Sequence, residues 1–290
     1  MGPLDLVRLT PLMSRSEGRR DVKVALIDGP VALGHPDLNQ SRIQELPTPV
    51  HGSCSRLDSV ACMHGTFVAG MLIARRGHAA PAICPDCTLL LRPIFPEHPN
   101  GSRSMPSATP SELASAINDS VRAGANVINL SAAITESSST GERDLHAALD
   151  HAAHRSVLVV AAAGNQGRVG SSVITAHPWV IPVVACDSKG WPTAESNLGS
   201  SIGRHGLAAP GENIVSLSGD GKTQTTTGTS AAAPFVTGTI ALLLSEFPRA
   251  TASQIKLALA GKRQHRRTIT PPLLDAWAAY EAMSRIRNTL

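Results

Sequence analysis

The sequence predicts an α/β protein with a mostly parallel central sheet and helices on both faces. Short apolar runs rich in β-branched residues alternate with segments of helical periodicity along the whole chain, the pattern of consecutive β-α-β units. The runs are continuously apolar, as expected of strands buried on both faces. With 290 residues, 42% of them hydrophobic, the chain suffices for one large core. No internal repeat or boundary divides it, so we expect a single domain, 1–290, with its core at about 20–280.

The predicted strands and helices follow one another along the chain. The apolar runs predict strands at 22–27, 88–91, 127–130, 157–161 and 180–185. The helix-period segments predict helices at 64–75, 110–123, 142–154, 230–246 and 252–260. A stretch rich in Pro and Ser, 96–111, is expected to be a long surface loop.

Local signals support several of these helices. Leu113, Ile117 and Val121 recur at i, i+4 and i+8 and therefore share one helical face. Pro248 ends the long apolar helix before it, and Thr251 is a suitable N-cap for the last helix. In such folds, ligands bind beyond the carboxyl ends of the parallel strands, so the functional site is expected there.

Charge and hydropathy exclude some partners. The formal net charge is +4 and the isoelectric point is 9.0. The basic residues lie in small scattered groups, at 19–20, 75–76, 262–263 and 266–267, and only 3% of residues are aromatic, which leaves little for base stacking. We therefore expect no nucleic-acid partner; a mildly basic surface suits an acidic peptide. No apolar stretch reaches the ~18 residues of a membrane span. Residues 1–20 lack a signal-peptide pattern, so we expect no membrane partner and a cytoplasmic location, unless a leader has been removed.

The five cysteines do not form the framework of a disulfide-rich secreted protein. Cys84 and Cys87 have the C-x-x-C spacing of metal knuckles and redox motifs, but a tetrahedral zinc site would need Cys54 and Cys62 beside them. We favour one or two local disulfides, or free thiols, over zinc. Cys186 lies in an apolar run and is expected to be a small buried hydrophobe. No metal or cofactor is expected.

Three residues supply the groups that serine catalysis needs. Each has an ordinary alternative: Asp28 as a turn residue, His64 as a surface or core histidine, and Ser230 as a helix N-cap. Together they provide a nucleophile, a base that takes its proton, and a carboxylate that orients the imidazole. Their order along the chain, Asp, His, Ser, is one of the orders in which such triads occur. The helix start at Ser230 adds N–H groups where negative charge develops.

Asn165 is a candidate fourth member of this group. It follows a predicted strand in a Gly-Asn turn, and by itself it can be a plain turn residue. In company with the three residues above, its side-chain amide becomes a candidate donor to the oxyanion of a tetrahedral intermediate.

Four sequence blocks together resemble the subtilisin-type serine proteases. They are IDG (27–29) with HPDL (35–38) just after it, HGTFVAG (64–70), AGN (163–165) and GTSAAAP (228–234). SNLG (196–199) and APG (209–211) agree as well, and the match runs from about residue 20 to 280. The resemblance implies a three-layer subtilisin-like fold and a serine endopeptidase that acts through an acyl-enzyme.

The same resemblance implies a place for the substrate. A peptide would bind as an extra strand between two edge segments of the protein. The expected pairing strand comprises Asn129, Leu130, Ser131, Ala132 and Ala133, with Ser104 near the second edge. Ala163, Gly164 and Ser172 would line the pocket for the side chain before the cut. The alternative for 127–133 is an ordinary buried strand.

The chain departs from the family pattern at four places. Gly29 stands where the family usually has a hydroxyl residue that binds the aspartate. Ala133 replaces a glycine of the substrate strand, and 173–175 replace a motif whose central proline is usually cis. Arg75 and Arg76 occupy the usual calcium loop, which argues against calcium there.

Within the family, ALIDGP (25–30), CMHGTF (62–67) and CPDC (84–87) look most like proteases that mature cyanobactin-type ribosomal peptides. Such enzymes cut leader or follower segments from a precursor peptide inside the producing cell. No long capping insertion is present, so the resemblance implies hydrolysis rather than macrocyclisation. Two alternatives remain open: a general degradative protease, and a peptide-binding pseudoprotease without turnover.

Overall fold

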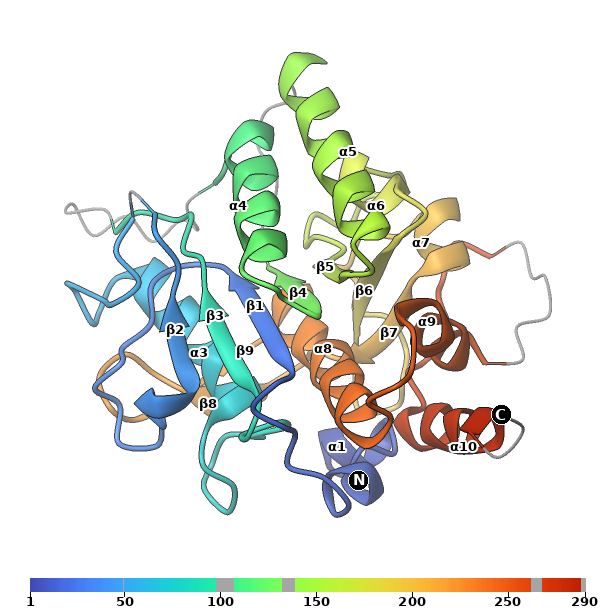
Figure 1. Ribbon diagram of the computed structural model, residues 1–290, viewed down its shortest axis with the longest axis horizontal. Coiled ribbons are helices and arrows are strands. Elements are labelled where there is room, and N and C mark those ends of the chain that lie inside the picture. The colour runs from blue at the N-terminus through green and yellow to red at the C-terminus, as the bar shows by residue number, and fades with distance from the viewer. Residues whose placement is uncertain (49, 98–106, 132–138, 262–267, 288–290) are drawn as a thin grey trace.

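The computed structural model describes residues 1–290 except 49, 98–106, 132–138, 262–267 and 288–290 (Figure 1). Its centre is a seven-stranded sheet in the order β2-β3-β1-β4-β5-β6-β7, in which every neighbouring pair is parallel. The strands are β1 Lys23–Ile27, β2 Ile43–Glu45, β3 Thr88–Leu91, β4 Val127–Leu130, β5 Leu158–Ala162, β6 Val180–Cys186 and β7 Leu207–Pro210. A separate antiparallel pair comprises β8 Ile214–Leu217 and β9 Thr223–Thr226. The α/β class and the parallel sheet predicted from the sequence are confirmed.

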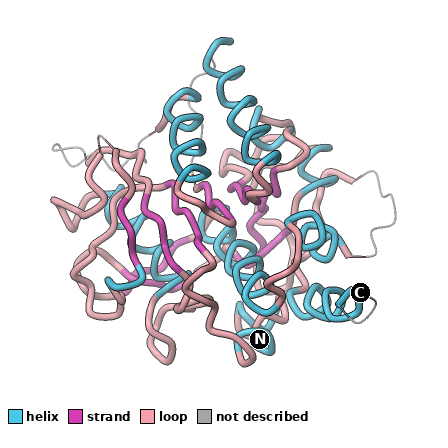
Figure 2. The backbone as a smooth tube through the Cα atoms, viewed as in Figure 1, coloured by secondary structure: helices cyan, strands magenta, loops and turns pink. Residues whose placement is uncertain are grey.

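Helices cover both faces of the sheet (Figures 1 and 2). The longer ones are α3 Val60–Ile73, α4 Pro110–Arg122, α5 Ser139–His154, α8 Thr229–Glu246, α9 Ala252–Ala260 and α10 Ala276–Arg287; the shorter ones are α1 Pro3–Leu6, α2 Thr10–Met13, the 3-10 turn η1 Gln40–Arg42, α6 Val173–Ala176 and α7 Ser200–His205.

Alternate side chains of one strand show the two layers. In β1, Val24 and Leu26 join the apolar cluster of α3, α8, α9 and α10, whereas Ala25 and Ile27 join that of α4 and α5. The protein therefore has three layers.

The strand order changes direction at β1, and the candidate site lies at this point of the sheet. β1 lies between β3 and β4, so successive connections leave it toward opposite edges of the sheet. A crevice forms beyond the carboxyl ends of the strands at such a switch point. Asp28 follows β1 directly, at that end of the sheet.

Helix α3 begins four residues earlier than the sequence suggested. The predicted helix was 64–75, but Ser59 is the N-cap, and its side chain accepts a hydrogen bond from Cys62 N. His64 therefore lies in the second turn of α3 rather than at the helix start. In the second turn, the helical hydrogen bonds already fix its backbone.

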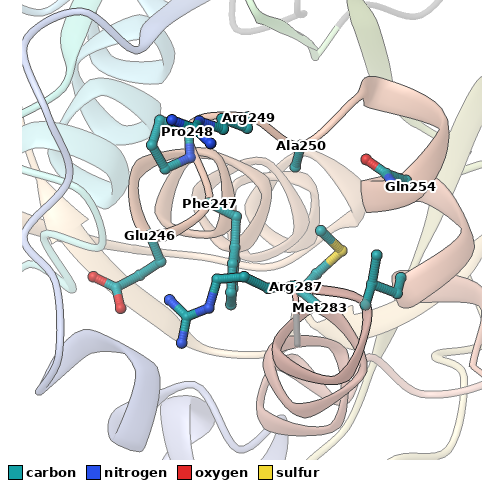
Figure 3. A pocket seen from close by; sticks show the side chains of 9 residues that line it. Glu246, Phe247, Pro248, Arg249, Ala250, Gln254, Met283 and Arg287 are labelled. Carbon is teal, nitrogen blue, oxygen red and sulfur yellow. The ribbon is translucent and has the colours of Figure 1, made fainter. Parts of the chain in front are cut away.

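Helix α8 lies on the same face of the sheet as α3 and packs against β4, β5, β6 and β7. Ser230 lies at its beginning, and Glu246 ends it roughly 24 Å away, at 1.5 Å per residue. A cavity of about 400 Å³ opens at that far end, between α8, α9 and α10 (Figure 3). Its lining includes Phe247 and Met283 with Arg249 and Arg287. It is thus remote from the predicted catalytic serine.

The five cysteines are all described. Cys54 and Cys62 form a disulfide, while Cys84 and Cys87 are buried free thiols in the turn before β3. A four-cysteine zinc site is therefore not built; of the expected alternatives, one or two local disulfides or free thiols, the structure has one disulfide and leaves the other cysteines free. Cys186 is fully buried at the end of β6, where burial raises the pKa of its thiol to about 12, so it is a small core residue as predicted.

Within the described ranges, no helix has the length and apolar character needed to cross a membrane.

Candidate active site

Asp28 is fully buried at the carboxyl end of β1. Its Oδ1 accepts hydrogen bonds from the backbone N–H of Gly29 at 2.6 Å and from His64 Nδ1 at 2.7 Å. Its Oδ2 is buried without a hydrogen-bond partner in the described part of the chain. The departure from the family pattern at Gly29 thus has a structural counterpart: no neighbouring hydroxyl reaches the second carboxylate oxygen.

His64 connects the buried carboxylate to the serine. Its Nδ1 lies 2.7 Å from Asp28 Oδ1 and its Nε2 lies 2.9 Å from Ser230 Oγ. Burial lowers the pKa of His64, but the charge of Asp28 and the hydrogen bond to it outweigh this, and the net pKa is raised above 6.5. A proton on Nδ1 that is donated to Asp28 leaves the Nε2 lone pair free to accept the proton of Ser230.

Ser230 is the second residue of α8. Gly228, not Ser230, is the N-cap of this helix, so the ordinary capping explanation for the serine is wrong. Its hydroxyl points instead at His64 Nε2. The first N–H groups of a helix have no intrahelical acceptor. Ser230 therefore lies where a helix N-terminus offers donors to a developing negative charge.

Asn165 lies in the turn after β5, next to the start of α8. Its side-chain Oδ1 accepts from Thr229 N at 2.8 Å and from Thr229 Oγ1 at 3.0 Å. Thr229 Oγ1 in turn accepts from Gly164 N at 3.1 Å. The Asn165 amide oxygen is thus fixed, and within the described residues its nitrogen has no recorded acceptor. Asn165 is exposed, so this nitrogen can donate to a ligand beside Ser230.

The structure corrects part of the predicted substrate strand. Asn129 and Leu130 belong to β4, which pairs with β1 on one side and β5 on the other, so they have no free edge for a peptide. Both are fully buried, and Asn129 ties Ser131 Oγ to Thr237 Oγ1 with bonds of 2.9 and 2.8 Å. Ser131 is also buried. Asn129 and Leu130 therefore support the site from within the sheet and offer no edge to a substrate. Ser131 follows β4, outside both ladders, and its pairing with a substrate stays a prediction.

The other predicted subsites fall in three groups. Ser104, Ala132 and Ala133 lie outside the described residues. Ala163 and Gly164 directly precede Asn165, and Gly164 N donates to Thr229 Oγ1 at the start of α8; their role in lining a substrate pocket stays a prediction.

Ser172 caps α6 and bonds to Thr175, and no recorded contact joins it to the catalytic group. Residues 173–175, which replace the family's cis-proline motif, belong to this short helix.

Two residues that hold the site together were not among the predicted site residues. Thr229 adjoins the serine in the GTS block, and Asn197 lies in the SNLG block that resembled the family; both signals were in the sequence. Their hydrogen bonds join segments that are far apart in the sequence: Thr229 of α8 bonds to 164–165, and Asn197 bonds to 163–168, which the sequence alone does not reveal.

The fold and this Asp-His-Ser arrangement define a serine protease. The chain belongs to the subtilase family, whose model matches residues 19–269. It is 29% identical to subtilisin DY from Bacillus licheniformis over 262 residues, 89% of each chain. It is 32% identical to a thermostable alkaline protease from Halalkalibacterium halodurans over 81% of this chain, but spans only 60% of that longer protein.

Two solved structures extend the likeness to peptide maturation. A mutant of the protease domain of PatA matches with a TM-score of 0.80 and 32% identity, over 92% of this chain and 97% of that one. The prenylagaramide maturation protease PagA matches with a TM-score of 0.79 and 29% identity, over 94% of this chain and 98% of that one. The resemblance to cyanobactin-type maturation proteases is therefore confirmed at the level of structure.

Proposed function

We propose that this protease hydrolyses a ribosomally made precursor peptide through an acyl-enzyme, with Ser230 as nucleophile, His64 as general base and acid, and Asp28 as its orienting carboxylate. The observation that carries the catalytic roles is the unbroken relay from Asp28 Oδ1 through both nitrogens of His64 to Ser230 Oγ, at 2.7 and 2.9 Å. Both distances lie within hydrogen-bond reach.

The chemistry follows from this relay. Ser230 Oγ attacks the carbonyl carbon of the peptide bond, and its proton passes to His64 Nε2. The imidazolium is stabilised by Asp28, and the oxyanion accepts hydrogen bonds from Asn165 Nδ2 and from an N–H at the start of α8. When the intermediate collapses, His64 protonates the leaving amine and an ester with Ser230 remains. Water then attacks this ester by the same proton path and releases the acid.

The precursor substrate is supported by the relatives. PagA is named as a prenylagaramide maturation protease, and this chain aligns with 98% of that chain. Precursor peptides of this kind are made on ribosomes, so the proposal includes a peptide partner and action in the cytoplasm.

A two-arm experiment tests the proposal. Wild-type protein should react with a fluorophosphonate probe at Ser230, and Ser230→Ala should abolish labelling while the circular-dichroism spectrum stays unchanged. Folded wild-type protein that never labels would identify a pseudoprotease. In the second arm, mass spectrometry of a diverse peptide library should show cleavage at one defined motif with casein left intact. Rapid digestion of casein and of most library peptides would instead identify a degradative enzyme.

A further inference from the structure

Asn197 holds in place the segment 163–168, which carries Asn165. Both nitrogen protons and the oxygen of its side-chain amide are used on residues of one short stretch, 163–168. Its Nδ2 donates to Ala163 O at 3.1 Å and to Gln166 Oε1 at 2.7 Å, and its Oδ1 accepts from Gln166 N at 3.1 Å and Arg168 N at 3.0 Å. Its backbone N–H donates to Gly164 O at 2.9 Å. Five hydrogen bonds from one residue thus span both sides of Asn165.

The contact between Asn197 and the segment is also close in space. Gly164 has φ of +102°, and a Cβ added there would lie 2.4 Å from Asn197 Nδ2. The glycine therefore both permits the left-handed turn and admits the amide beneath it.

Asn197 is itself fixed to the sheet through its neighbour. Ser196 is buried, and its Oγ accepts from Ala185 N at 3.1 Å and donates to Ala185 O at 3.2 Å. Ala185 belongs to β6, a strand inside the sheet. A continuous path of hydrogen bonds therefore leads from the rigid sheet through 196–197 to the turn of Asn165.

We propose that Asn197 is a positioning residue for the oxyanion donor: it holds the 163–168 segment so that Asn165 Nδ2 is aimed at the reacting carbonyl. The inference rests on the proposed function of Asn165. Such positioning matters because Asn165 is exposed and, among the described residues, the recorded hydrogen bonds to its side-chain oxygen come from Thr229 alone. An oxyanion donor contributes through its fixed geometry, and one that must be reoriented during the reaction loses that advantage.

The test compares Asn197→Ala with the wild type on a fluorogenic peptide taken from the library and on the fluorophosphonate probe. Asn197→Ala should lower kcat by ~10-fold or more while KM changes little, because a small misplacement of a catalytic group acts on the transition state. The rate of phosphonylation should fall in parallel. If the alanine variant does not fold, Asn197→Ser, which keeps a polar group of smaller size, serves the same comparison.

Asn126→Ala is the matched control. Asn126 Oδ1 accepts from Lys23 N at 2.8 Å, at the start of β1 and thus at the end of the sheet away from the site. Its loss should reduce the melting temperature and leave kcat unchanged.

A double-mutant cycle distinguishes positioning from general loosening. If Asn197 acts through Asn165, then Asn197→Ala should lower kcat in the wild type but not in an Asn165→Ala background. Equal losses in both backgrounds, or a change in KM alone, would overturn the inference. The single variant Asn165→Ala reports separately on the proposed function: it should lower kcat by ~10²–10³. An unchanged kcat there would remove the oxyanion role of Asn165 and the positioning role of Asn197 with it.

Discussion

Gly29 and Ala61 are in main-chain contact: a Cβ added to Gly29 would lie 2.1 Å from the carbonyl oxygen of Ala61. Gly65, one turn further along α3, meets the same stretch, since a Cβ there would lie 2.4 Å from Pro30 O. The chain after Asp28 therefore runs directly against the first turns of the helix that carries His64. Backbone contact, with no side chain between, sets the distance between the carboxylate and the imidazole.

This contact predicts that Gly29→Ser damages the enzyme, although its hydroxyl is what the unpartnered Asp28 Oδ2 lacks. The new Cβ must push α3 away, and such overpacking costs ~1–3 kcal/mol of unfolding free energy. We expect kcat to fall by ~10-fold or more as His64 moves from Asp28. Gly34→Ala is the control, because nothing lies within 4 Å of its Cβ position. A serine variant with full activity and higher stability would show that the helix yields.

The pH dependence of kcat/KM should have its acid limb above 6.5. The catalytic form needs neutral His64, and Asp28 raises its pKa from 6.5. Activity should therefore rise as the pH passes through this raised value. The stability of the folded state depends on pH in the opposite direction. The Asp28–His64 pair stabilises the folded state fully below pH 6.5, and this contribution is lost as the pH rises through the raised pKa of His64.

Asp28→Asn should move the acid limb to lower pH. The same change should lower kcat by ~10⁴-fold, because an amide that donates to Nδ1 would favour the wrong tautomer of His64. Rates of peptide hydrolysis measured from pH 5 to 10 for both proteins test this. An acid limb that lies at the same pH in both proteins would contradict the coupling.

Much of the fold could be predicted because it depends on local patterns. The capped helix after Thr251 begins where predicted, since Thr251 and Gln254 form a reciprocal capping box. β2 was not predicted, because three residues are too few to show a periodicity. The start of α3 was misplaced because the apolar run before His64 carries no polar face.

The site divides in the same way. The proposed catalytic residues lie in compact sequence blocks, and their types alone point to the chemistry. The assignment of Asn129 and Leu130 failed because strand order is not local: only the sheet shows that β4 lies between β1 and β5.

Arg76 should contribute strongly to holding the N-terminal segment against the rest of the protein. Its guanidinium donates to four backbone carbonyls, those of Met13, Ser16, Ala82 and Ile83. Arg76→Ala leaves these carbonyls without their donor, and we expect it to lower the unfolding free energy by ~1.5–3 kcal/mol. Arg75→Ala is the control, because the neighbouring Arg75 is exposed and has no recorded side-chain contact among the described residues. Equal urea midpoints for the two variants would contradict the prediction.

The Arg76 contacts also predict a weak response to chelators. A guanidinium bound to backbone carbonyls at the turn after α3 leaves these oxygens unavailable to a metal ion. Addition of EDTA should therefore leave the melting temperature unchanged. A large decrease that calcium reverses would reveal ligands elsewhere in the chain.

Reduction of the Cys54–Cys62 disulfide should lower stability more than activity. The bond closes a loop of eight residues' separation, and loss of such a crosslink costs ~2–3 kcal/mol in the chain-entropy model. A second set of contacts holds this loop: the Glu97 carboxylate accepts hydrogen bonds from the hydroxyls of Ser55 and Ser59 at 2.5 and 2.8 Å. These hydrogen bonds to Glu97 should keep the loop in place when the disulfide is reduced.

The experiment measures melting temperature and kcat with and without dithiothreitol. The reductant has one disulfide to act on, since Cys84, Cys87 and Cys186 are free thiols. Wild-type protein should melt at a lower temperature when reduced and keep its kcat. The variant Glu97→Gln, whose neutral amide is a weaker acceptor, should keep its kcat when oxidised and lose it when reduced, because Cys62 lies two residues before His64 on α3. A kcat that collapses on reduction of the wild type would show that the disulfide alone holds His64 in place.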